Sequence, residues 1–270
     1  MKRTAWGTAA WLAAMAFVAG SAGLAAAAGM HGRPPPRDLH PFVELHVPRA
    51  GAPIAIDAET EGKRVWEPEA GGTGVFKDAL GNGIVPFTEA KARWTPDTLY
   101  FLLYAGDLDL EGTVTEKDGP VARDDSFHVE LGHEGRVYTI DVSVLGTIAD
   151  ADCAGEVGGL QPTSRRCDTS WDSHAKVAVD RDGTLNQLGD NDEEWVIEMA
   201  IPVASLGLGS LGEGDRIPFA IQRCEVGKRG VGACGGFGTG KVRGEIVLEP
   251  EVAEARHVAS ARAVGDRAAP

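Results

Sequence analysis

The sequence lacks the short motifs that mark the common enzyme classes. Its 270 residues contain no Gly-x-Ser-x-Gly nucleophile elbow, no His-Glu-x-x-His pair of metal ligands and no glycine-rich phosphate loop that ends in lysine. Each of these motifs places reacting groups at a fixed spacing, and none of them is present. We therefore expect a binding protein rather than an enzyme.

Positively charged residues are also scarce. The chain has 26 Lys and Arg against 40 Asp and Glu, which gives a formal net charge of −14 at pH 7. Such an acidic surface repels nucleic acids and anionic lipids. We therefore expect no nucleic-acid partner, whereas neutral ligands, cationic ligands and divalent metals are compatible with the charge.

The hydrophobic stretch near the start of the chain is too short to span a bilayer, which takes about 18–20 apolar residues. It runs from Ala9 to Val18, follows the basic pair Lys2 and Arg3, and leads into small residues up to Ala28. This order is typical of a secretory signal peptide. We predict that residues 1–28 are cleaved, and that the mature protein is secreted or periplasmic and not embedded in a membrane.

Cysteine is rare: the chain has four, and no two of them form a C-x-x-C pair. A zinc site is therefore the less favoured interpretation. Disulfides persist in oxidising compartments, so the predicted export favours two bridges. Of the three connectivities, Cys153–Cys167 with Cys224–Cys234 is the simplest, because each bridge closes one glycine-containing loop and contributes about 2–4 kcal/mol.

The order of segments along the chain predicts one β domain with two tails. Residues 29–50 include three consecutive prolines and are interpreted as an N-terminal tether. Residues 51–250 hold short alternating segments separated by Gly, Asp, Asn and Pro, which is typical of antiparallel strands. Residues 251–270 are predicted to be a short helix or a disordered tail. The fold class is therefore predicted to be all-β, an antiparallel two-sheet β-sandwich.

The alternation within each strand also assigns side chains to faces, because residues two apart point the same way. Phe127, Val129 and Leu131 are predicted to face the core. The polar residues between such apolar positions face outward and form a strip that we predict to bind a ligand. This strip consists of His128, Glu130, Thr139, Asp141 and Gln222.

Several segments, taken in order, resemble the family 9 carbohydrate-binding modules and their DOMON-like relatives. The segments are Ile54 to Asp57 with Trp66, Ala90 to Trp94 with Asp97 to Tyr100, the Asp125-Ser126 strand, Trp195 to Pro202, and Phe219 to Gln222. Ala58 stands where the family commonly has glycine. The resemblance implies a jelly-roll-like β-sandwich that binds a saccharide or polysaccharide without cleaving it. It also implies a role in carbohydrate catabolism beside an extracellular enzyme or cell-surface partner.

The chain departs from this family at the positions that hold aromatic rings in sugar-binding members. The loop before the Asp125-Ser126 strand has no aromatic residue, and the loop before the last strand offers only Phe237. Gln222 fits the family's polar set. Trp171 lies in a polar loop after Cys167, and we interpret it either as a platform for a sugar or as a rim residue packed on the sandwich.

Clusters of aspartate raise the question of calcium, which takes six to eight oxygen ligands. A structural calcium site is predicted from Asp107, Asp109, Asp124 and Asp125, and a second candidate loop contains Asp190, Asn191 and Asp192. The alternative is that these residues form ordinary solvated turns. No cofactor is required by any sequence feature.

Two further functions remain open at this stage. Some DOMON-type domains hold a b-type haem between axial side chains, and Met199 with His128 is the candidate pair. The alternation of Met199 with Trp195 and Ile197 favours a core position instead. The other alternative is a structural or partner-binding sandwich that has lost sugar binding.

Overall fold

The structure is a computed structural model. It describes residues 42–60, 63–67, 69–84, 86–158, 165–187, 189–225, 234–239 and 242–251. These residues belong to one compact unit that covers residues 40–270. The predicted signal peptide, residues 1–28, lies outside the described residues, as do residues 252–270 of the predicted tail and residues 29–41 of the predicted tether.

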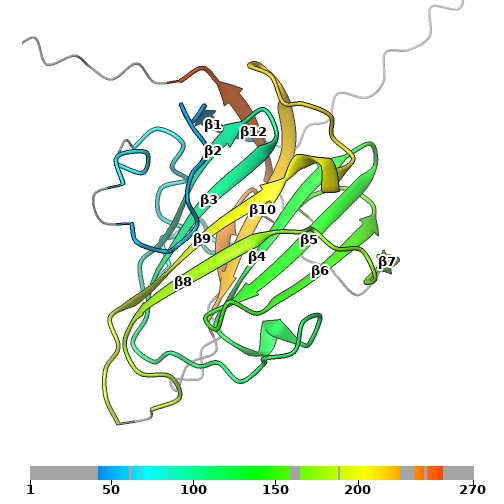
Figure 1. The fold of residues 1–270 in the computed structure, drawn as a ribbon. Coiled ribbons are helices and arrows are strands. Elements are labelled where there is room, and N and C mark those ends of the chain that lie inside the picture. Colours follow the sequence, from blue (N-terminus) through cyan, green and yellow to red (C-terminus); the bar gives the residue numbers. More distant parts are fainter. Residues whose placement is uncertain are drawn as a thin grey trace, which may run out of the picture. The chain divides into compact units, whose positions relative to one another are not determined.

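The strands form one sheet of eight strands and one sheet of four, seen in Figure 1. Sheet A consists, in spatial order, of β1 (Phe42–Pro48), β12 (Arg243–Glu249), β10 (Arg216–Cys224), β4 (Ser126–His133), β5 (Arg136–Ser143), β6 (Ile148–Ala154) and β7 (Cys167–Asp168), with β11 (Cys234–Phe237) also paired to β10. Sheet B consists of β2 (Thr88–Thr95), β3 (Thr98–Gly106), β9 (Glu194–Pro202) and β8 (Lys176–Asp182). Two short 3₁₀ helices are η1 (Val121–Arg123) and η3 (Val203–Leu206). Within the described residues, no helix is long and apolar enough to cross a membrane.

The core lies between the two sheets because the apolar side of each strand points inward. Phe101 of β3 stacks on Phe219 of β10 with 5.6 Å between ring centroids, and Phe127 of β4 contacts Trp195 of β9 at 5.1 Å. All four rings are buried. Fully burying a large apolar side chain contributes about 1.5–3 kcal/mol. The predicted two-sheet β-sandwich is confirmed, and its strand pairs are antiparallel except for β1 with β12.

Strand β1 corrects the predicted boundary between the tether and the sandwich. Residues 42–48 were assigned to the tether, yet they pair with β12 along its whole length, from Phe42 opposite Arg243 to Pro48 opposite Glu249. Leu45 and Val47 are buried in the core. The predicted boundary was wrong because the tether, inferred from the three consecutive prolines, was extended into a segment that forms a strand.

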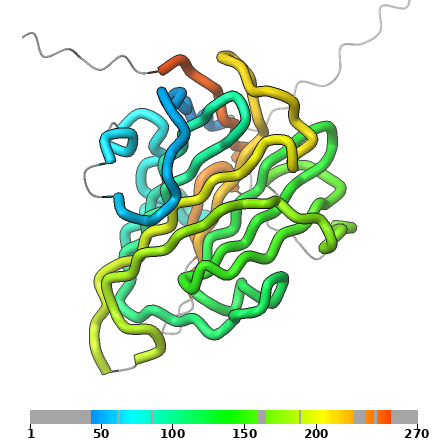
Figure 2. The backbone as a smooth tube through the Cα atoms, in the orientation of Figure 1, coloured from blue at the N-terminus to red at the C-terminus, as the bar shows by residue number. Residues whose placement is uncertain are grey.

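Part of the outward side of sheet B, over β3 and β9, is covered by a segment drawn in blue to cyan in Figure 2, in which Ile54, Ile56 and Trp66 pack against Tyr100 and Ala200. Glu198 of β9 fastens this cover, and its side chain is fully buried. One carboxylate oxygen accepts hydrogen bonds from the Ala58 amide at 2.9 Å and from Lys63 Nζ at 2.7 Å, while the other accepts from Trp66 Nε1 at 2.9 Å. Trp66, one of the residues on which the family resemblance rests, is therefore a packing residue.

Ala58 adopts a φ of 63°, which is in the left-handed region that favours glycine. In this conformation the Ala58 amide donates a hydrogen bond to the carboxylate of Glu198. The glycine that the family commonly has at this position would adopt the same angle without a clash between Cβ and the backbone.

A buried ion pair joins the two sheets at one end of the core. Arg223 of β10 donates through Nη2 to Asp107 Oδ2 at 2.6 Å, and both side chains are almost completely buried. Trp195 Nε1 donates to the same carboxylate at 3.2 Å, and Arg223 Nη1 donates to Thr88 Oγ1 at 3.2 Å. The two charges therefore have several partners inside the sandwich.

Replacing Arg223 with methionine should destabilise the protein by about 3–5 kcal/mol, because Asp107 would keep a buried charge without its counter-ion. Chemical denaturation would measure the loss. Arg216→Met is the matched control on the same strand, since Arg216 pairs with Glu245 at the solvent-exposed surface and its loss should change the stability little. Equal losses for the two variants would contradict the role of the buried pair.

Replacing Glu134 with asparagine should stabilise the protein by about 0.5–1 kcal/mol. The turn between β4 and β5 holds Glu134 at a φ of 46° and Gly135 at 76°, and Glu134 is exposed. Asparagine tolerates this region better than glutamate, and Asn-Gly is the preferred pair for such a hairpin turn. Thermal unfolding of Glu134→Asn would be compared with Glu213→Asn, a change of the same charge at a position without a positive φ. No gain over that control would refute the expectation.

Candidate functional site

A cavity of about 400 Å³ lies on the outward side of sheet A and is here called the outer pocket. Its volume is within the range of small-ligand sites. All five side chains of the predicted polar strip line it: His128, Glu130, Thr139, Asp141 and Gln222. The structure therefore brings together the residues of the strip, and their role in ligand binding remains a prediction.

Strand register explains why these residues meet. Gln222 of β10 lies opposite His128 of β4, which lies opposite Asp141 of β5. Glu130 and Thr139 form the next outward-facing pair along β4 and β5. Neighbouring strands are about 4.8 Å apart, so Gln222 and Asp141 are separated by about 10 Å across His128.

His128 is held between two carboxylates. Its Nδ1 donates to Asp141 Oδ1 at 2.8 Å, and its Nε2 lies 3.4 Å from Glu130 Oε1. Burial disfavours the charged ring, but the charge and the hydrogen bond of Asp141, followed by those of Glu130, outweigh it and raise the pKa of His128 to about 10. The imidazole is therefore a cation at neutral pH, and it serves as a fixed donor rather than as a general base.

Glu130 is more deeply buried than the other charged residues that line the outer pocket. Arg165 Nη1 donates to its Oε1 at 2.5 Å, and the Gly158 amide donates to its Oε2 at 2.7 Å. Burial raises the pKa of a carboxyl group, but the hydrogen bonds from His128 and Arg165 outweigh it and lower the pKa of Glu130 below 4.5. Glu130 therefore fastens the segment after β6 over the outward side of sheet A.

Both predicted disulfides are present, and both border the outer pocket. Cys153 of β6 is bonded to Cys167 of β7, and Cys224 of β10 is bonded to Cys234 of β11. In each case the two residues lie opposite each other on neighbouring strands. Cys153, Cys167 and Cys224 line the cavity, so the bridges form part of its wall.

Sequence reasoning missed three polar residues of the outer pocket. Arg165, Ser126 and Thr239 line it together with the predicted strip. Arg165 precedes Cys167 by two residues, so the predicted bridge to Cys153 was a usable signal that Arg165 reaches sheet A. Nothing comparable in the sequence placed Thr239, which comes from the segment after β11.

Trp171 is not part of the outer pocket. Its ring packs on Tyr138 with 5.1 Å between centroids, and its Nε1 donates to the Ser205 carbonyl at 3.1 Å. Tyr138 alternates with Thr139 on β5 and so points to the other side of sheet A. The structure therefore places Trp171 at the edge of the core, apart from the predicted polar strip, and its role in sugar binding stays a prediction.

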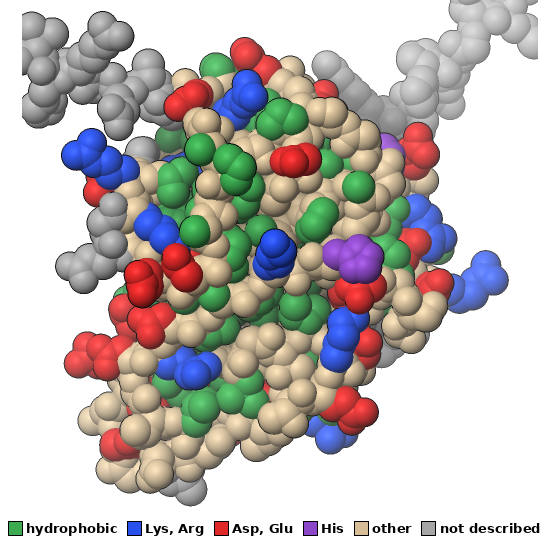
Figure 3. Space-filling model, viewed as in Figure 1, with side chains coloured by type: hydrophobic (Ala, Val, Ile, Leu, Met, Phe, Trp, Pro, Cys, Tyr) green, Lys and Arg blue, Asp and Glu red, His purple; other side chains and the backbone are tan. Residues whose placement is uncertain are grey.

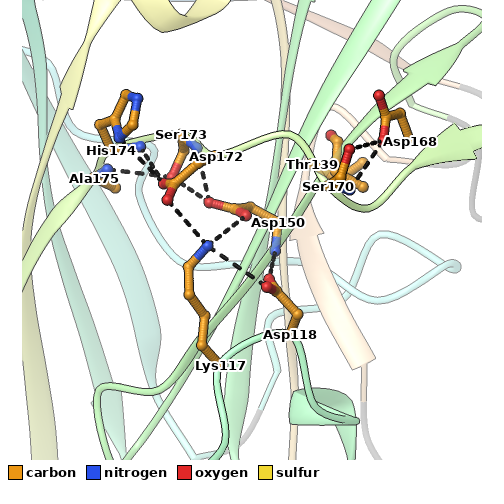
Figure 4. A network of polar contacts seen from close by, with 11 residues as sticks. Lys117, Asp118, Thr139, Asp150, Asp168, Ser170, Asp172, Ser173, His174 and Ala175 are labelled. Carbon is orange, nitrogen blue, oxygen red and sulfur yellow. Dashed lines mark hydrogen bonds and ion pairs between the residues drawn. The ribbon is translucent and has the colours of Figure 1, made fainter.

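The loop that follows Trp171 is fixed by a network of polar contacts, drawn in Figure 4. The buried Asp150 accepts hydrogen bonds through Oδ2 from the Ser173 amide at 2.9 Å and from Ser173 Oγ at 2.6 Å. Lys117 Nζ lies 3.4 Å from Asp150, 3.3 Å from Asp172 and 3.6 Å from Asp118. The network ties this loop to β6 and positions Trp171 against the core.

The structure does not assemble the four aspartates predicted to hold calcium, Asp107, Asp109, Asp124 and Asp125. Asp107 faces the guanidinium of Arg223. Asp124 Oδ2 accepts the Val114 amide and Asp125 Oδ2 accepts the Glu111 amide, each at 2.8 Å. No group of three or more His, Cys, Asp and Glu in the described part of the chain is arranged to hold a metal ion. The donor set does not fit calcium, because Asp107 pairs with Arg223 while Asp124 and Asp125 bind backbone amides of the loop after β3.

The second predicted calcium loop, Asp190 to Asp192, is organised in a similar way. Asp192 Oδ2 accepts the Leu110 amide at 2.7 Å, and its Oδ1 accepts the Thr184 amide at 2.8 Å. Thr184 Oγ1 also donates to Asp190. These contacts match the turn interpretation of the loop.

The pair of haem ligands considered from the sequence is not formed. Met199 of β9 is fully buried between the sheets. His128 points outward from sheet A into the outer pocket and is engaged by Asp141. The two side chains face different spaces and cannot bind one iron.

Comparisons with known proteins support the fold but not a family assignment by sequence. No protein-family model matches the chain, and no curated protein matches it. A candidate carbohydrate-binding protein from Bacteroides uniformis superposes with a TM-score of 0.53 at 14% identity, covering 76% of this chain and 99% of that one. A family 9 carbohydrate-binding module from Caldicellulosiruptor kristjanssonii, solved in complex with glucose, gives 0.50 at 14% identity and covers 79% and 100%. A structure of such a module from the same organism with cellotriose gives 0.50 at 15%, covering 79% and 97%. The chain therefore has the β-sandwich fold seen in family 9 modules, as its sequence predicted.

The pKa of His128 predicts a pH dependence of stability. A histidine whose pKa rises on folding stabilises the protein fully below its unfolded value, about 6.5, and loses that contribution as the pH rises toward about 10. The unfolding free energy of the native protein should therefore fall over this range relative to that of His128→Gln. NMR titration of the imidazole gives the direct measurement, and a midpoint near 6.5 would contradict the geometry.

Proposed function

We propose that this chain is an exported, non-catalytic carbohydrate-binding module whose ligand site is the outer pocket. The observation that carries the proposal is the row Gln222–His128–Asp141, which sets polar side chains across three strands inside a cavity of about 400 Å³. Such a row offers hydrogen-bond partners to the hydroxyl groups of a sugar. The solved neighbours with the same fold include modules in complex with glucose and with cellotriose.

Among the residues that the structure describes, no aromatic side chain lines the outer pocket. A sugar would therefore pack its C–H face against small apolar groups, including Ala122 and Ala220, and against the two disulfides. Without a ring to stack on, each contact gains less, so we propose weak binding to a single site and useful affinity only when several sites act together.

Export is supported by the two disulfides, which persist in oxidising compartments, together with the predicted signal peptide. A link to carbohydrate catabolism, beside a glycoside hydrolase or a cell-surface partner, belongs to the same proposal and rests on the family resemblance. The lack of an aromatic ring among the described lining residues favours one alternative, a sandwich that binds a protein partner instead of a sugar.

Calorimetric titration with glucose, cellobiose and cellotriose should give saturable binding that Gln222→Ala weakens by about five- to tenfold, the loss of one or two hydrogen bonds. Trp171→Phe is the control and should leave the affinity unchanged, because Trp171 packs on the opposite side of sheet A. Flat titrations against soluble and insoluble glycans alike would refute sugar binding and favour the protein-partner alternative.

A further inference from the structure

The hydrogen-bonding groups of the outer pocket are unequally occupied. His128 directs both ring nitrogens to carboxylates. Arg165 is used by Glu130 and by the Glu156 carbonyl, at 2.5 and 2.6 Å. The charged donors of the pocket are thus already engaged with the protein, and they leave little capacity for an acidic ligand.

The acceptors of the outer pocket are more open. Asp141 bonds His128 through Oδ1, and its Oδ2 accepts no hydrogen bond from the described residues. The side chain of Asp141 is 26% exposed, whereas that of Glu130 is 5% exposed. Gln222 also lines the cavity, and its one contact, from Nε2 to the sulfur of Cys224 at 3.3 Å, leaves the amide oxygen without a hydrogen bond from the described residues.

The charge of the whole chain, rather than that of the outer pocket, also favours a cationic ligand. The charged residues that line the outer pocket are His128, Arg165, Glu130 and Asp141, which sum to zero. The whole chain carries a formal charge of −14, and Figure 3 shows acidic side chains distributed over the face it displays. A cation therefore approaches a negative molecule and meets an open carboxylate oxygen, whereas an anion meets cations that are already neutralised.

We infer that the outer pocket prefers a saccharide that carries a protonated amine, that is, an amino sugar, with the ammonium group on Asp141 Oδ2, a nearby hydroxyl on Thr139 and a hydroxyl of the second sugar unit on Gln222. This inference rests on the proposed function and narrows its ligand class. Gln222 and Asp141 are about 10 Å apart, two strand spacings, which is comparable with the length of a disaccharide.

Three β-1,4-linked disaccharides of glucose type test the preference, because they differ only in the substituent at C2. They are the glucosamine disaccharide with free amines, its N-acetylated form, and cellobiose. Calorimetric titrations at about pH 6 should show the free amine binding about five- to tenfold more tightly than the other two, as expected for a hydrogen bond to a charged group.

Two further measurements assign the effect to its groups. Asp141→Asn keeps the shape of the side chain and should abolish the preference, so that the free amine and cellobiose bind this variant with equal affinity. Asp180→Asn is the matched control, because Asp180 is exposed on β8 of the other sheet. At about pH 9 the sugar amine is largely neutral, and the preference should be lost although His128, with a pKa of about 10, stays charged.

Each outcome decides a different question. Equal affinities, or tighter binding of cellobiose, would overturn the inference on amino sugars and leave the proposed saccharide function intact. A preference that Asp180→Asn removes as fully as Asp141→Asn would assign it to the overall charge and also overturn the inference. No binding of any of the three disaccharides would overturn both the inference and the proposed function.

Discussion

The contact between Asp107 and Arg223 is the constraint on which the sandwich depends most strongly. Two opposite charges lie 2.6 Å apart where the sheets meet, far from water, and Trp195 adds a hydrogen bond to the same carboxylate. Such a pair tolerates little displacement, because separating the charges in a low-dielectric interior costs much more than it does in water. It therefore fixes β10 against sheet B, and β10 in turn carries Gln222 on its other side.

The outward sides of the two sheets have one arrangement in common. Each carries a glutamate that a covering segment buries, Glu130 on sheet A and Glu198 on sheet B. Each glutamate accepts a backbone amide and a cationic side chain from its cover, through Gly158 and Arg165 in one case and Ala58 and Lys63 in the other. On sheet B the cover packs closely, whereas on sheet A the cover borders a cavity. The same fastening thus supports packing on one side of the molecule and a candidate binding site on the other.

Local rules allowed much of this molecule to be predicted. Alternation placed Phe127 in the core and His128 outside it, because a strand repeats every two residues, and the short loops between cysteines indicated both bridges. Contacts between distant segments were less visible. The pairing of β1 with β12, the position of Trp171 on Tyr138 and the reach of Arg165 to Glu130 all depend on how loops return across the sandwich. The aspartate-rich loops could not be interpreted from the sequence alone, because an aspartate that binds backbone amides has the same sequence signature as one that binds a metal.

The two disulfides form parts of the wall of the outer pocket, and they limit the conformational change that the pocket can make when a ligand binds. A segment that a disulfide links to a neighbouring strand has few alternative conformations. Less conformational entropy is therefore lost when a small molecule binds there. Recognition at such a place follows from a shape that exists beforehand. Selectivity then depends on the functional groups of the ligand, because these parts of the pocket wall cannot rearrange to fit a ligand of a different shape.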